Sequence, residues 1–275
     1  MTSPGRGGPP SAWADAATGL GDFARQVLAV AGSEMHKLGR DPTELLTRSV
    51  QPILWLLVFG QVFGRTHAIP TGGLGYLDFM APGVLAQSIL FTSIFFGIAI
   101  IWERDLGILQ KTLVSPAYRS ALVLGKGLSA GVRALAQSAL VVVVTLVLGI
   151  RLRAHPAYWV GVVLAVAVGA AVFSTFSLVV ACVVKTRERF MGIGQVLTMP
   201  LFFASNAIYP IDLMPGWLQV VARLNPLTYL VDGLRYLMVE GAASAFGLGV
   251  DLAVQVLVLA LLVAVAARLY PTVAV

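Results

Sequence analysis

The charged residues of this chain separate long stretches that contain none. Six such runs are rich in Leu, Val, Ile, Ala and Phe. A helix needs roughly 20 mostly apolar residues to cross the hydrocarbon core of a bilayer, and about 17 suffice at the short end. The first and last runs are short, but Leu45 and Leu46 can extend the first, and the uncharged stretch 241–250 precedes the last. The pattern predicts an all-α integral membrane protein with six spans, at 49–64, 79–102, 134–150, 156–184, 190–211 and 252–267.

Two segments outside these runs have helical periodicity. In 23–40, apolar residues recur every three or four positions, opposite a face with Arg25, Lys37 and Arg40. This is typical of an interfacial helix lying on the membrane, and packing on a soluble partner is the alternative. In 103–116, a charged start is followed by leucines spaced three and four residues apart. This pattern suits a short helix that docks a cytoplasmic partner, and a plain basic anchor loop is the alternative.

The segment 212–246 is too apolar for a free loop. It contains two short amphipathic stripes separated by Asn225-Pro226, a turn signal. We predict an external re-entrant helical hairpin, since irregular backbone is tolerated at membrane depth when it is buried in protein; an extracellular cap on the bundle is the alternative. Asp232 and Arg235 are expected near the outer interface, paired with each other or reaching water, in a structural role.

Composition and charge place the whole chain in a membrane. Its 275 residues are 58% hydrophobic and 12% charged, with a mean hydropathy of +0.86. This excludes a cytosolic enzyme, a nucleic-acid-binding domain and a disordered chain. Of the 19 Lys and Arg residues, fourteen fall in segments on the side of the termini and five on the other. The positive-inside rule therefore predicts cytoplasmic termini, with residues 1–22 as a flexible, Gly- and Pro-rich cytoplasmic tail.

The sequence offers little catalytic chemistry. The three histidines lie in three separate segments outside the spans, and the single cysteine, Cys182, stands in an apolar run. No G-x-x-x-x-G-K-[ST] motif occurs, so we expect no nucleotide, cofactor or metal on this chain and any ATP hydrolysis on another polypeptide. The spans hold almost no carboxylates, which weakens a proton- or ion-coupled transporter.

Aromatic, Met and amide side chains in the second and fifth runs are candidates for contact with an apolar or amphipathic substrate. Lipid-facing positions and helix packing explain them equally well. Pro200, in the fifth run, predicts a kink. The candidate lining residues are Phe91, Phe95, Met199, Phe202, Phe203 and Asn206.

Two stretches resemble one known family. ERDLGILQKTLVSPAYRSALVLGK (103–126) resembles the cytoplasmic loop of type-2 ABC exporter permeases, E-R-E-x-G-T-L-x-x-L-x-V-(S/T)-P followed by L-G-K. SNAIYPIDLMPGWLQVVARLNPLTYLVDGLR (205–235) is similar to the outer segment of the same family, and Ile108 stands where that family usually has Thr. The nearest branch looks like the daunorubicin-resistance permeases. The outer motif matches at Asn225, Pro226, Thr228, Tyr229, Asp232 and Arg235.

This resemblance implies one domain over 23–275, an ABC-2 permease in the plasma (inner) membrane. The chain would pair with a second permease, an identical copy, and with two cytoplasmic ABC ATPase subunits that use ATP and Mg²⁺. The helix 103–116 would be the coupling helix that docks the ATPase. Its docking residues would be Glu103, Arg104, Asp105, Gly107 and Leu109.

The predicted function is ATP-driven export of a hydrophobic or amphipathic, antibiotic-like or drug-like compound. We expect the chain to contact membrane lipids and no nucleic acid. The same architecture exporting a lipid-linked glycan or envelope lipid is the first alternative. A channel or secondary transporter that works without an ATPase is the second.

Overall fold

The computed structural model describes residues 42–66, 69–95, 97–98, 101–102, 119–184 and 186–273. The predicted tail 1–22, interfacial helix 23–40 and coupling helix 103–116 lie outside these residues, as do the docking residues Glu103 to Leu109. Within the described part, regular structure is helical apart from an isolated antiparallel bridge between Leu152 and Val239.

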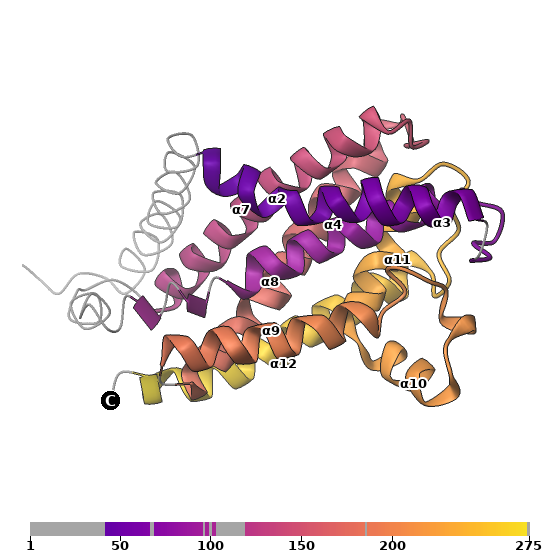
Figure 1. Cartoon of the computed structure of the whole chain (residues 1–275). Helices are drawn as coiled ribbons and strands as arrows, with labels where there is room; N and C mark the ends of the chain where they lie inside the picture. Colours follow the sequence, from indigo (N-terminus) through magenta and orange to yellow (C-terminus); the bar gives the residue numbers. More distant parts are fainter. Residues whose placement is uncertain are drawn as a thin grey trace, which may run out of the picture.

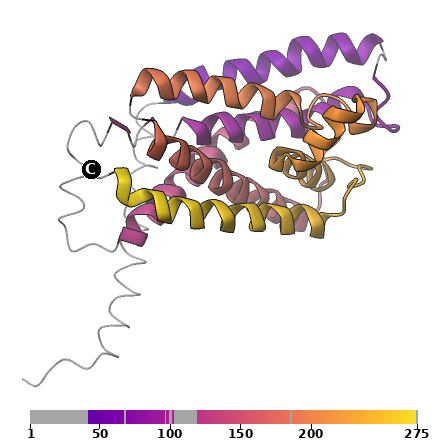
Figure 2. The ribbon, with the colours of Figure 1, turned by 90° about the horizontal axis from the view of Figure 1, so that it is seen from below.

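The long helices run roughly side by side, as Figures 1 and 2 show. The start of α2 and the end of α12 lie at the same end of the bundle, and α10 and α11 lie at the other. The first and last helices that the structure describes therefore have their terminal ends at one end of the bundle, and the segment predicted to be external lies at the other.

Four of the described helices are long and apolar enough to cross a membrane. They are α4 (Tyr76–Ile94) and α8 (Pro156–Val183), together with Ala130–Val147 of α7 (Arg119–Val147) and Leu248–Ala266 of α12 (Leu248–Val273). They match the second, third, fourth and sixth predicted runs. The helix α4 packs against α7, α8 and α11, and almost all of its residues are buried, so it is a central element of the bundle.

The first predicted run forms an unbroken helical path of three segments. These are α2 (Pro42–Leu54), the π-helical η1 (Trp55–Gly60) and α3 (Gln61–Thr66). Pro52 lies inside α2, just before the π-helical turn. Since proline donates no backbone hydrogen bond, it disturbs the helix there, and single π-helical turns occur mostly within α-helices and often at functional sites.

The fifth predicted run is helical over a shorter length than its apolar pattern indicates. The helix α9 (Arg187–Phe203) has 17 residues, about 26 Å at 1.5 Å per residue. Thr186 caps its start by accepting a hydrogen bond from the Arg189 N–H (3.4 Å). The chain turns at 204–207, so Pro200 stands in the last turn of α9 and not in the middle of a longer span.

The outer segment contains the two predicted helices. After the short 3-10 helix η2 (Ile211–Leu213) come α10 (Gly216–Leu224) and α11 (Pro226–Met238). The break falls at Asn225, as the turn signal predicts. The helix α11 packs against α4, α8 and α12, whereas α10 contacts mainly η2 and α11. The segment therefore combines one helix inserted in the bundle with one at its margin (Figure 1).

Candidate functional site

A row of aromatic rings joins the first helical path to the end of α9. The indole of Trp55 stacks on Phe59, with ring centroids 4.3 Å apart. Its other neighbours are Phe202 and Phe203, which meet it edge-on at 5.8 and 6.1 Å. Phe59 in turn stacks on Phe63 at 6.3 Å. We call these five residues the aromatic cluster. Four of their rings are exposed or half-buried and only that of Phe202 is buried, so the cluster forms part of a surface.

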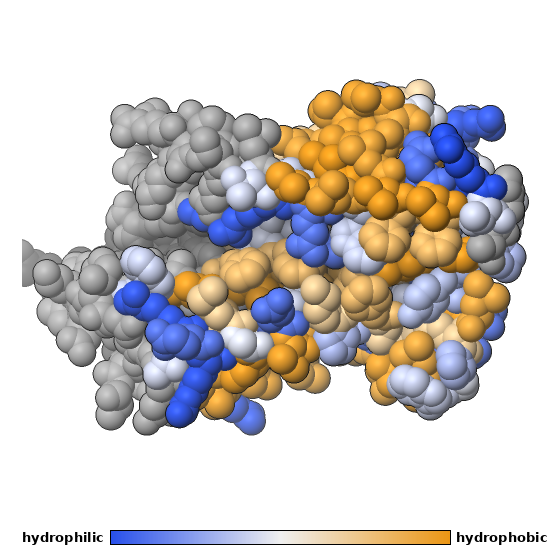
Figure 3. All heavy atoms as spheres, viewed as in Figure 1, coloured by the Kyte–Doolittle hydropathy of each residue, from blue (hydrophilic) through white to orange (hydrophobic). Residues whose placement is uncertain are grey.

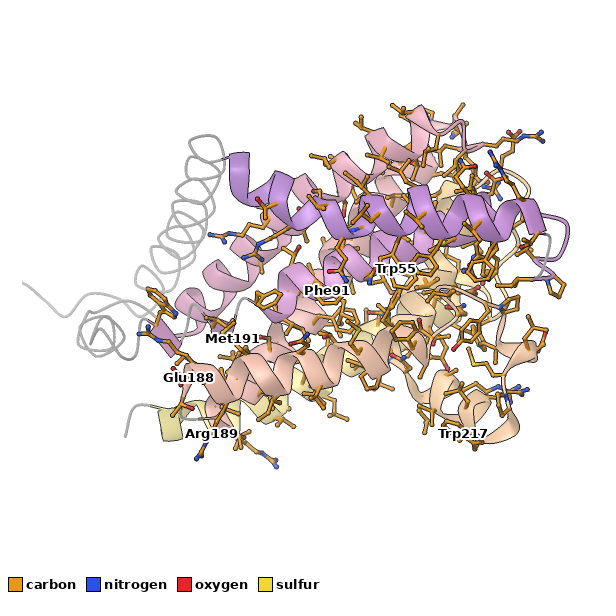
Figure 4. All side chains as sticks on the ribbon, viewed as in Figure 1. Trp55, Phe91, Glu188, Arg189, Met191 and Trp217 are labelled. Atoms are coloured by element: carbon orange, nitrogen blue, oxygen red, sulfur yellow. The ribbon has the colours of Figure 1, made fainter. Side chains whose placement is uncertain are left out.

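This surface is apolar beyond the cluster. Val50, Leu54, Leu57, Val58 and Val62 of the first helical path are exposed, as are Met191 and Val196 of α9. In Figure 3, hydrophilic residues gather at the start of α9, and most of its remaining length is apolar. In Figure 4, Trp55 and Phe91 lie in the band between the first helical path and α9.

The structure divides the candidate lining residues into two groups. Phe203 (41% exposed) and Phe95 lie on the surface, and the Arg48 guanidinium carbon stands 5.5 Å from the ring centre of Phe95. Phe91 and Met199 are half-buried. Phe202 and Asn206 are buried, which indicates packing for these two in the conformation described.

The end of α9 is fixed by hydrogen bonds from Tyr209, shortly after it, and from Asn225, at the start of α11. The Tyr209 hydroxyl donates to the carbonyl oxygen of Phe203 (2.6 Å), and burial raises the pKa of this phenol. The side-chain amide of Asn225 donates to the carbonyl oxygens of Leu201 (2.6 Å) and Ala204 (3.1 Å). Its oxygen accepts from the Leu227 N–H (3.0 Å) and so caps α11. Asn225 thereby links α9 to α11.

Arg235 is buried (5% exposed) and connects three elements. Its guanidinium donates to the carbonyl oxygens of Phe79 in α4 (3.2 Å) and Asn206 after α9 (2.7 Å). The guanidinium carbon also lies 3.8 Å from the centre of the Phe79 ring. These contacts support the structural role that the sequence predicts.

Asp232 is also buried (1% exposed) and fixes the loop before α12. Its Oδ2 accepts hydrogen bonds from the Ser244 hydroxyl (2.7 Å) and from the N–H groups of Ala245 (2.8 Å) and Phe246 (3.2 Å). The expectation that Asp232 and Arg235 reach water is therefore wrong. The hydrogen bonds described for the two side chains go to different partners, although the negative charge of Asp232 acts on Arg235. Both side chains are buried because α11 is inserted among other helices.

The remaining outer-motif residues lie along α11. Pro226 is its first residue, and the Pro226 carbonyl oxygen accepts from the side-chain amide of Gln255 in α12 (2.5 Å). Thr228 is buried. The Tyr229 hydroxyl donates to the carbonyl oxygen of Arg223 (2.7 Å), which ties α11 back to α10. The motif thus acts as a set of contacts at the outer end of the bundle.

Sequence reasoning missed two residues that the structure brings into this region. Trp55 is the central ring of the aromatic cluster, and the signal for it was present: Trp55, Phe59 and Phe63 are spaced by four residues. Gly83 of α4 lies against Ala207, so close that a methyl group at Gly83 would stand 2.3 Å from the Ala207 carbonyl oxygen. No local pattern signals that approach.

Comparison with known proteins agrees with this architecture. The family described as ABC-2 type transporter matches residues 25–239. The daunorubicin resistance ABC transporter permease of Streptomyces coeruleorubidus is 28% identical over 229 residues, which cover 83% of this chain and 80% of that protein. An inner membrane transport permease of Escherichia coli is 24% identical over 217 residues, covering 76% and 80%. A protein of Cyanophora paradoxa named as a transport permease is 29% identical over 219 residues, covering 78% and 74%. This chain belongs to the ABC-2 type transporter family and is a membrane-integral transport permease.

Proposed function

We propose that this permease is the membrane subunit of an ATP-driven exporter that moves hydrophobic or amphipathic, drug-like compounds outward across the plasma membrane. The observation that carries the proposal is the aromatic cluster on an open apolar surface, with Trp55 at its centre. Flat aromatic side chains of this kind bind planar apolar ligands well. The name of the Streptomyces relative, a daunorubicin resistance permease, favours the same substrate class.

The membrane arrangement we propose has six spans. The path Pro42–Thr66 and α9 would be the first and fifth, added to the four helices that are clearly long enough. Both termini would be cytoplasmic, because Lys and Arg are concentrated on that side. The pair α10 and α11 would re-enter the membrane from the outer face. The helix α11 is buried among other helices, and re-entrant backbone is tolerated at membrane depth when it is buried in protein.

The partners we propose are a second, identical permease and two cytoplasmic ABC ATPase subunits. The exposed apolar side chains of the first helical path and α9 would suit contact with a second copy. The ATPase subunits would hold ATP and Mg²⁺ and would dock on Glu103, Arg104, Asp105, Gly107 and Leu109. Closure of the ATPase pair would then separate the two permeases at the face that carries the aromatic cluster.

Export of a lipid-linked glycan or envelope lipid is the second candidate within this architecture. The apolar face would also accommodate acyl chains. The aromatic cluster favours a planar compound over an acyl chain, which gains nothing from ring stacking.

The experiment combines purification and transport. Tagged protein would be extracted from its native membrane in mild detergent, and co-purifying proteins would be identified by mass spectrometry. A stoichiometric ATPase with a Walker A motif is expected, and the reconstituted complex should accumulate daunorubicin in inverted vesicles only with ATP. A stable complex that moves a lipid-linked glycan and no aromatic compound would reject the proposed substrate. A permease that is active without any ATPase would reject the exporter itself.

A further inference from the structure

Gln87 of α4 is a buried amide without hydrogen-bond partners among the described residues. It is 1% exposed, and neither its Nε2 nor its Oε1 is paired. An amide that is removed from water and left unpaired lowers the stability of a fold. A methionine would fill nearly the same volume without that cost. The unpaired amide lowers the stability of this conformation, so we look for its role in another conformation of the permease, in which the amide has a partner.

The packing of α4 on α9 places Gln87 beside the aromatic cluster. At one end of the contact, a methyl group at Gly194 would lie 3.5 Å from the Ile94 side chain, and at the other end Gly83 meets Ala207. The two helices are therefore antiparallel along this contact. Residues 83, 87, 91 and 94 are spaced by four, four and three, and they share one face of α4.

Gln87 thus lies between the two contact points, on the face turned toward α9. The matching buried stripe of α9 is formed by residues at intervals of four: Phe190, Gly194, Thr198 and Phe202. Phe202 contacts Trp55 directly. The amide of Gln87 is consequently an unpaired polar group in a seam whose other members, apart from Thr198, are apolar or aromatic.

This seam is sparsely packed. The helix α9 has few contacts with α4 and α8, whereas α4 packs extensively against α7, α8 and α11. Movement of α9 would therefore expose Gln87 and Phe91 together while the rest of the bundle stays intact.

We propose that Gln87 is a specificity-determining residue, which hydrogen-bonds a carbonyl or hydroxyl group of an aromatic substrate when the seam between α4 and α9 opens. This inference rests on the proposed function and adds a chemical requirement to it. The substrate carries a polar group close to its planar ring system, because the amide lies beside aromatic side chains. An amide both donates and accepts, so it can pair with either kind of group.

The test uses Gln87→Met with Gln137→Met as its matched control. Gln137 is equally buried, but its Nε2 donates to the Ser49 hydroxyl (2.7 Å), in a contact between α7 and α2. Gln87→Met should raise the Tm of the purified complex by about 2–4 °C. Gln137→Met should lower it by a similar amount, because it breaks an existing hydrogen bond.

Binding would be measured by fluorescence with two probes. Daunorubicin has hydroxyl and carbonyl groups on a planar ring system, whereas perylene is planar and has no polar group. Gln87→Met should weaken daunorubicin binding about fivefold to tenfold and change perylene binding by less than about twofold. Gln137→Met should leave the ratio of the two affinities unchanged.

The outcomes separate this inference from the proposed function. If the wild-type complex binds daunorubicin and Gln87→Met binds it equally well, the role of Gln87 is refuted while the function stands. An equal loss of affinity for both probes would also refute it, because a general change in the packing of the site would explain that result. If the wild type binds neither probe, the proposed substrate class fails, and the role of Gln87 fails with it.

Discussion

The substitution Gly83→Ala tests whether the outer end of the bundle depends on the contact of α4 with the turn after α9. The added methyl group would lie 2.3 Å from the Ala207 carbonyl oxygen, 2.7 Å from its Cα and 2.8 Å from its carbonyl carbon. These are backbone atoms, so no side-chain rotation can relieve the overlap. Ordinary contacts need about 3.5 Å, and the turn must therefore move by about 1 Å.

The expected loss of stability follows from two opposing effects. Overpacking of a well-packed site costs about 1–3 kcal/mol, and the upper value applies because the obstacle is backbone. Alanine favours a helix over glycine by about 1 kcal/mol, which leaves a net loss of about 2 kcal/mol. The displaced turn also carries the Asn206 carbonyl oxygen that binds Arg235. For a chain of this size the loss corresponds to a fall in Tm of about 4–8 °C.

The assay is thermal unfolding in detergent, followed by fluorescence-detected size exclusion. Gly249→Ala is the control, because Gly249 is exposed, lies in α12, and has no atom within 4 Å of the position of the added methyl group. Its Tm should equal or exceed that of the wild type. A well-expressed Gly83→Ala protein that melts at the wild-type temperature would show that α4 does not approach the Ala207 backbone this closely.

Four further experiments test other contacts and the proposed docking segment. Arg235→Met should cost about 2–4 kcal/mol, since it leaves two buried carbonyl oxygens without a charged donor; the yield of folded protein should fall more than substrate affinity, and the reverse would give Arg235 a binding role. Asp232→Ala should destabilise by about 2–3 kcal/mol, measured as Tm, whereas an unchanged Tm would discount the network at Ser244. Trp55→Ala should weaken daunorubicin binding about tenfold, and Trp55→Phe should restore most of it; equal binding by both would remove Trp55 from the site. The double change Glu103→Ala and Asp105→Ala should uncouple ATP hydrolysis from transport or prevent assembly, and full transport by that variant would reject the docking role.

Local patterns in the sequence were sufficient to locate most helices. Runs without charge mark α4, α7, α8 and α12. A charged side chain in the bilayer lowers stability whatever the tertiary fold, so its absence can be seen in the local sequence. Asn225-Pro226 marks the break between α10 and α11, since proline suits the first turn of a helix and asparagine its cap. These features depend only on neighbouring residues.

Features that depend on distant residues could not be predicted in this way. The apolar run of the fifth span continues to residue 211, but α9 ends at Phe203, where Asn225 binds the carbonyl oxygens of Leu201 and Ala204. The partners of Arg235 are likewise remote, since the Phe79 carbonyl oxygen lies 156 residues away in the chain. A buried arginine that binds backbone looks, in sequence, the same as one that reaches water.

The distribution of contacts within one permease supports the proposed opening of the seam between α4 and α9. The helices α4, α8, α11 and α12 pack extensively on one another, and Arg235 and Asp232 fix their outer ends. The first helical path and α9 lie at the margin and expose apolar side chains. Because packed interfaces move as rigid bodies while sparse ones separate, the aromatic cluster and Gln87 lie at the boundary between the part of the permease that stays fixed and the part that can open. A substrate bound there would contact both parts, and its release would follow from their separation.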